Sequence, residues 1–161
     1  MSRKLARRHA FHIIYQMPFH SDSPQSLAEQ KMYYTDFVAG DLGDIDDFSI
    51  LGRPMIGRDA DYIEKTVWGV FDNQQELDAV ICRFLKEGWA IDRINKVELA
   101  LLRLAIFEML ILCDVPSGVA ISEAVELAAS YSSDESPAFV NGILSRISEN
   151  IPAKGSPDAS K

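Results

Sequence analysis

Apolar residues recur at intervals of three and four positions along almost the whole chain of 161 residues. This spacing places them on one face of an α-helix, whereas a strand would need strict alternation, which no segment shows. The pattern is densest from Asn95 to Cys113, where nearly every side of a helix would be apolar. We therefore predict an all-α fold in which this segment is the central helix, with neighbours on several sides.

Seven segments carry the helical pattern, at approximately residues 3–17, 26–39, 60–71, 77–88, 95–113, 119–131 and 134–147. Ser133 and Asp134 are expected to cap the last of them, with Pro137 tolerated in its first turn. Residues 40–58, rich in aspartate and glycine, are predicted to form an acidic loop. The organisation expected is a helical domain over residues 1–150 and a disordered tail over residues 151–161.

The two cysteines and the apolar segments indicate the cellular compartment of the protein. Cys82 and Cys113 lie in apolar helical patterns, so we interpret them as reduced core thiols in a reducing compartment. The N-terminus has no continuous apolar segment of the kind found in signal peptides. Glu98, Arg103 and Glu108 interrupt the longest apolar run, which argues against a membrane span. The sequence predicts a cytoplasmic protein.

The motifs of common enzyme classes are not found. There is no nucleophile elbow, Walker loop, dinucleotide fingerprint, HExxH or paired CxxC. His9 and His12 are three positions apart and could share a metal ion, but solvated surface histidines are the preferred interpretation. Asp46 and Asp47 are interpreted as part of a solvated acidic loop. We expect no catalysis, no cofactor and no metal site.

Charge is distributed unevenly along the chain. The net charge is −8, yet residues 1–20 contain four basic residues and no acidic one. The rest of the chain holds twelve basic and 24 acidic residues, a net charge of −12. A basic patch on an acidic body can bind a polyanion locally while the body repels it elsewhere.

The four basic residues share one arc of the first predicted helix. On a helical projection this arc holds Arg3, Lys4, Arg7 and Arg8, and it continues through Phe11 and Tyr15. Guanidinium groups grip phosphates through paired hydrogen bonds, and aromatic rings stack on unpaired bases. The mixture suits RNA binding. The alternative is a solvated cationic helix end whose aromatic side chains pack against a neighbour.

Several motifs in the C-terminal two thirds resemble the NusB transcription antitermination family. They are VAISEAVELA over 119–128, FVNGIL over 139–144, Asp92-Arg93-Ile94 and LLRLAIFEML over 101–110. The opening Arg7-Arg8-x-Ala10, followed by Tyr15-Gln16, fits the same family. The resemblance covers about residues 3–150 in the same order.

This resemblance implies about seven helices in two packed subdomains and no catalysis. It implies binding to the boxA element of nascent ribosomal RNA transcripts together with NusE, a small-subunit ribosomal protein. The pair would then load onto elongating RNA polymerase and suppress premature termination.

The resemblance also implies a set of site residues. For RNA binding these are Arg3, Lys4, Arg7, Arg8, Glu135, Phe139 and Asn141; for the protein partner they are Tyr15 and Glu98. Each has an alternative. Phe139 also fits the buried face of its helix, and Asn141 and Gly142 could serve a cap or close helix packing. Glu98 could be solvated, or favoured near a helix N-terminus. Arg103 and Glu108 are expected to make structural ion pairs or caps.

Three positions depart from the family pattern. Ser122 replaces a common Asn, and Ala129 and Ala138 replace residues that are commonly basic. The two alanines remove positive charge near the implied RNA surface. They motivate an alternative, a protein-only interaction module that keeps a homodimer or NusE contact. The same fold also occurs as an appendage of ribosomal RNA cytosine methyltransferases. We expect no room for such a domain in 161 residues, so the chain could be such a module only as a fragment.

Overall fold

The computed structural model describes residues 3–16 and 58–152, and these are helical with no strand among them. The elements are α1 (Arg3–Gln16), α4 (Arg58–Asp72), α5 (Gln74–Phe84), a 3₁₀ turn (Ile91–Arg93), α6 (Lys96–Phe107), a π-helical segment (Glu108–Leu112), α7 (Ser117–Tyr131) and α8 (Ser136–Asn150). The all-α prediction is confirmed. The predicted helix over 26–39, and nearly all of the predicted acidic loop and tail, lie outside the described residues.

The chain divides into two compact units, residues 1–65 and 66–161, with the boundary inside α4. In the first unit, α1 buries the apolar face that its spacing predicts. Its buried apolar residues are Ala6, Ala10, Phe11, Ile13 and Ile14. The first half of α4 adds Tyr62 and Ile63, each 4% exposed.

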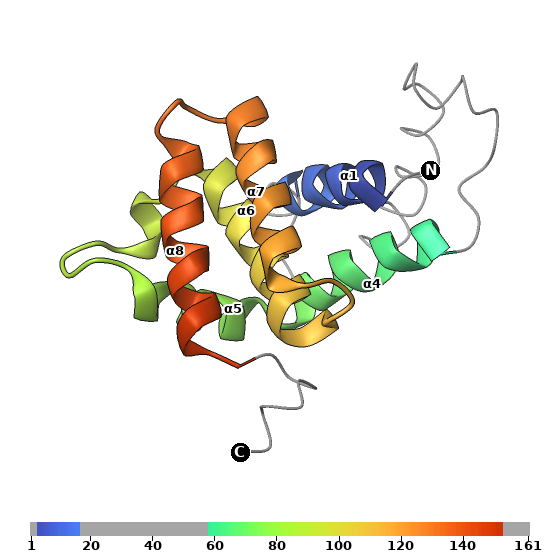
Figure 1. Ribbon diagram of the computed structural model, residues 1–161, viewed down its shortest axis with the longest axis horizontal. Helices are drawn as coiled ribbons and strands as arrows, with labels where there is room; N and C mark the ends of the chain where they lie inside the picture. The colour runs from blue at the N-terminus through green and yellow to red at the C-terminus, as the bar shows by residue number, and fades with distance from the viewer. Residues whose placement is uncertain (1–2, 17–57, 153–161) are drawn as a thin grey trace, which may run out of the picture. The chain divides into compact units, whose positions relative to one another are not determined.

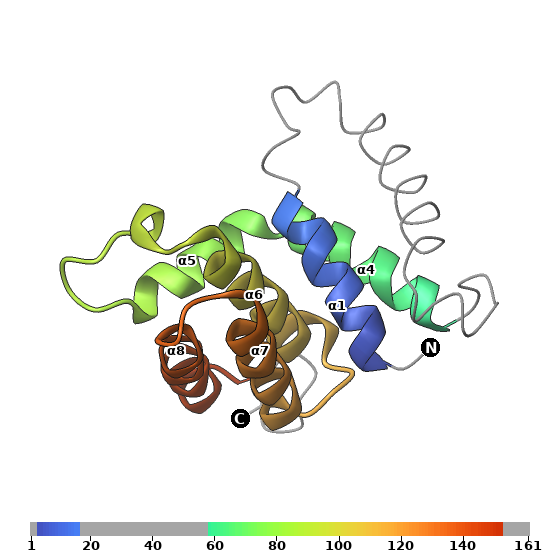
Figure 2. The same ribbon diagram turned by 90° about the horizontal axis from the view of Figure 1, so that it is seen from above.

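In the second unit α6 is the central element. Every residue from Ala100 to Leu110 is buried, and α6 contacts α5, α7 and α8. Figures 1 and 2 show α7 and α8 side by side, with α6 next to them. The prediction of a central helix with neighbours on several sides is therefore confirmed. It follows from a segment that is apolar around its whole circumference.

The two ends of this central segment differ from a plain helix. At its start, Asn95 is the N-cap, and its side-chain Oδ1 accepts a hydrogen bond of 2.8 Å from the backbone N–H of Glu98. At its end, the chain widens into the π-helical segment and stops at Cys113, whose φ of 56° is left-handed. The spacing of apolar residues predicted the segment but not its π-helical ending.

Two local predictions about α8 and the cysteines were wrong. The N-cap of α8 is Glu135, not Ser133 or Asp134, and no side chain caps the helix; Pro137 does lie in the first turn. Within the described residues Cys82 and Cys113 form no disulfide, but both are exposed and not part of the core. Each is adjacent to the apolar pattern, Cys82 beside the buried face of α5 and Cys113 just beyond the helix end.

None of the helices within residues 3–16 and 58–152 is long and apolar enough to cross a membrane. In the same residues, no three His, Cys, Asp or Glu side chains are grouped so that they could hold a metal ion.

Candidate nucleic-acid interface

The basic residues of α1 do not share one environment. Lys4 is exposed, Arg3 and Arg8 are half-buried, and Arg7 is only 3% exposed. Arg7 falls inside because it lies one turn from the buried Phe11, on the same side of the helix. The stripe predicted from the helical projection is therefore split, and Arg7 does not present its guanidinium to solvent.

The aromatic part of the predicted stripe is also divided. Phe11 is 2% exposed and cannot stack on a base, whereas Tyr15 is half-buried, with its ring centroid 6.3 Å from that of Phe11. His9 is buried at 4% exposure, which corrects its interpretation as a solvated histidine; His12 is half-buried. The outward side of α1 thus presents Lys4, Arg8, His12 and Tyr15.

A buried residue of α4, Tyr62, lies against the basic residues of α1, and the sequence did not indicate this contact. The guanidinium carbon of Arg3 lies 4.2 Å from the ring centroid of Tyr62, and that of Arg7 lies 6.0 Å from it. All three residues belong to the first unit. No local pattern could reveal Tyr62, because it stands more than fifty positions from Arg3 and Arg7 and reads as an ordinary core residue of α4.

In the second unit, Glu98 is bound within the protein. It is half-buried in the first turn of α6 and accepts a short hydrogen bond from the hydroxyl of Ser136, which is fully buried at the start of α8. The Ser136 Oγ also lies 2.7 Å from the Oγ of Ser132 and 3.1 Å from that of Ser133. Asn95 Nδ2 donates to the Ser132 Oγ over 3.2 Å.

These hydrogen bonds connect the N-terminus of α6 to the turn between α7 and α8. They therefore join Glu98, the implied partner residue, to the helix that carries the implied C-terminal RNA residues. The interpretation of Glu98 as simply solvated is corrected.

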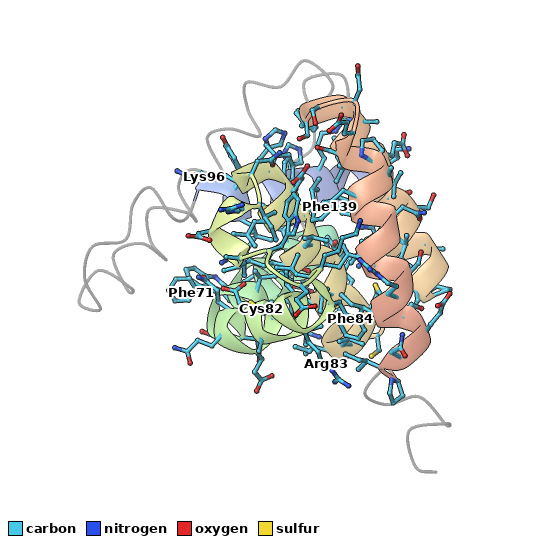
Figure 3. The ribbon with its side chains drawn as sticks, turned by 90° about the vertical axis from the view of Figure 1, so that its left-hand side faces the viewer. Phe71, Cys82, Arg83, Phe84, Lys96 and Phe139 are labelled. Atoms are coloured by element: carbon cyan, nitrogen blue, oxygen red, sulfur yellow. The ribbon has the colours of Figure 1, made fainter. Side chains whose placement is uncertain are left out.

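The residues that the family resemblance implies for RNA binding in the C-terminal segment lie at the start of α8. Glu135 and Asn141 are exposed, and Phe139, labelled in Figure 3, is half-buried. A Cβ added to Gly142 would meet no atom within 4 Å, so close helix packing does not explain this glycine. The outer side of α8 is therefore open at Asn141 and Gly142.

The expected structural ion pair of the central helix is present. Arg103, 9% exposed, donates from Nε and Nη2 to the two carboxylate oxygens of Asp78 in α5, over 2.7 and 2.8 Å. Glu108 is buried at 1% exposure in the π-helical segment. Both charged residues thus belong to the interior of the second unit.

Comparison with known proteins assigns the family. The family model of the NusB family matches residues 4–149. The transcription antitermination protein NusB of Acetivibrio thermocellus is 40% identical over 147 residues, covering 91% of this chain and 88% of that protein. NusB of Rubrobacter xylanophilus is 38% identical over 151 residues, covering 94% and 93%.

Solved structures agree. This chain matches T. maritima NusB with a TM-score of 0.73 and 27% identity, over 96% of this chain and 95% of that one. It matches a structure of the antitermination factors NusB and NusE in complex with double-stranded RNA with a TM-score of 0.65 and 26% identity, over 91% and 96%. The family is one of transcription factors and not of enzymes. The chain therefore belongs to the NusB family of transcription antitermination proteins.

Proposed function

We propose that this protein binds boxA RNA of nascent ribosomal RNA transcripts jointly with NusE, and that the complex acts on elongating RNA polymerase to suppress termination. The observation that carries the proposal is the outward side of α1, where Lys4 and Arg8 accompany Tyr15 on an otherwise acidic chain. The relative solved with NusE and RNA supports the same pair of ligands.

On α1, we assign phosphate contacts to Arg3, Lys4 and Arg8. Their side chains are exposed or half-buried, whereas the buried Arg7 contributes positive potential from behind them. Tyr15 offers a partly open ring beside them, and we assign it to the contact with NusE.

On α8, the exposed Asn141 can hydrogen-bond a base edge, because its amide both donates and accepts. Glu135 can accept from exocyclic base amines, and the half-buried Phe139 supplies apolar contact at the edge of the site. In the second unit we also assign Glu98 to a contact with NusE; its carboxylate accepts a hydrogen bond from Ser136.

A gel-shift titration with boxA RNA, with and without NusE, tests this function. Three phosphate contacts on α1 predict that log K falls with log salt with a slope of about −2 for a single strand, before any contribution from NusE or α8. A scrambled RNA of equal length is the control. Absence of binding to boxA RNA at low salt, with NusE present, would contradict the proposal.

A second candidate is a protein-only interaction module. It is favoured by Ala129 and Ala138, which are both exposed and so do remove surface charge where relatives commonly carry a basic residue. Charge reversal by Lys4→Glu and Arg8→Glu separates the two functions. If the protein binds RNA jointly with NusE, the charge reversals should greatly weaken RNA binding while NusE binding is retained. If it is a protein-only module, neither the RNA affinity nor the NusE affinity should change.

A further inference from the structure

The ring of Tyr62 meets two cations of α1. Arg3 and Arg7 are one helical turn apart and therefore share a side of the helix. Their guanidinium carbons lie 4.2 and 6.0 Å from the ring centroid, and Tyr62 is 4% exposed. A guanidinium within about 6 Å of an aromatic face is attracted by the negative face of the ring. Of the two, Arg3 is the closer to the ring.

Stacking on Tyr62 does not use the hydrogen-bonding edge of Arg3. The contact with Tyr62 uses the flat face of the guanidinium, whereas phosphate is bound by the N–H groups along its edge. Arg3 is half-buried, so part of this edge stays accessible to solvent, although Nη1 itself is buried and has no hydrogen-bond partner within the described part of the chain. A stacked arginine has already lost part of its side-chain freedom, so less entropy is lost when it binds a phosphate.

We infer that Tyr62 is a positioning residue for the RNA surface, which holds Arg3 in the orientation that binds phosphate. Tyr62 is itself buried and does not touch the RNA. Arg7, farther from the ring and buried, is not the group presented. The inference rests on the RNA-binding role proposed for α1, and it adds a residue from a different helix to that site.

Substitution at position 62 tests the contribution of the ring. We expect Tyr62→Leu to weaken boxA RNA binding in the presence of NusE by about 3- to 10-fold, and to make the salt slope shallower by about 0.7, equivalent to one phosphate contact. Tyr62→Phe keeps the ring and should bind within twofold of the wild type. Pentafluorophenylalanine at position 62 keeps the shape but reverses the ring's charge distribution, so it should behave like Tyr62→Leu even if the leucine variant folds poorly.

A double-mutant cycle separates positioning from a general structural effect. Arg3→Ala and Tyr62→Leu should be strongly non-additive in RNA affinity, since either change removes the same contact. The matched cycle uses Arg8→Ala, which lies on the same helix, and it should be additive with Tyr62→Leu. If Tyr62 only supported the fold, both cycles would give the same coupling.

The outcomes distinguish this inference from the function on which it rests. If Lys4→Glu and Arg8→Glu weaken RNA binding but the leucine and fluorinated variants bind normally, the positioning role is wrong and the function stands. If no RNA binding is found for the wild type with NusE, both are wrong. We expect Tyr62→Leu to be coupled to Arg3→Ala but not to Arg8→Ala, and we expect Tyr62→Phe to retain the RNA affinity of the wild type.

Discussion

Arg103 in α6 binds Asp78 in α5 through two parallel hydrogen bonds, 25 positions apart in the sequence. Arg103 is 9% exposed, and the Asp78 side chain keeps 26% of its surface accessible. Such a two-point contact orients both helices as well as pairing their charges. It ties the short α5 to the central helix of the second unit.

We expect Asp78→Ala to lower the free energy of unfolding by about 2 kcal/mol, less than for a fully buried pair, because Asp78 retains contact with solvent. The loss arises because the Arg103 charge remains in the interior without its carboxylate. Urea denaturation measures it. The double variant Asp78→Leu with Arg103→Met should recover most of the stability, because no unpaired charge remains. If it lost as much stability as Asp78→Ala, the loss would not come from the broken ion pair.

Gly69 in α4 is required by the ring of Phe107. A Cβ built on Gly69 would overlap the ring, so Gly69→Ala forces the side chain or the helix to move. We expect a loss of about 1–3 kcal/mol in thermal or urea unfolding, typical of an overpacked core. Gly142→Ala is the matched control in α8, since its Cβ would meet nothing within 4 Å, and it should instead gain up to about 1 kcal/mol from helix propensity. Similar effects at both glycines would contradict the assignment.

Ser136 holds the junction between α6 and α8. Ser136→Ala removes the hydroxyl that donates to Glu98 and lies 2.7 Å from the Ser132 Oγ. Because the site is buried, we expect a loss of about 1–2 kcal/mol in unfolding experiments. Ser130→Ala is the control, because that exposed hydroxyl donates to the carbonyl of Glu126 in its own helix, and it should change stability by less than about 0.5 kcal/mol. An equal effect of the two would show that the network adds nothing.

Cys113 occupies a backbone conformation that favours glycine. Its φ is 56°, where a side chain is strained, so Cys113→Gly should raise the free energy of unfolding by about 0.5–1 kcal/mol. Cys82→Gly, within α5, should lower it by about the same amount, since glycine weakens a helix interior. If Cys113→Gly destabilises the protein, the contact of its Sγ with the Met109 carbonyl at 3.5 Å outweighs the strain.

Much of the helical architecture follows from the sequence alone. The periodicity of apolar residues locates the described helices to within a few positions and identifies the central one, because burial around a whole circumference leaves a continuous apolar run. The ending of that helix does not follow in the same way. The π-helical turn and the left-handed Cys113 leave no regular spacing in the sequence.

The environment of each site residue was decided by tertiary structure. The sequence places four basic residues and two aromatic ones on an arc of α1, but it cannot set how wide the buried side of that helix is. Burial takes Arg7 and Phe11 inward and leaves Lys4 and Arg8 outward. The stacking of Arg3 on Tyr62, and the binding of Glu98 by Ser136, join residues that are far apart in the chain. Helical periodicity relates only near neighbours along the chain, so such contacts exist only once the helices have packed.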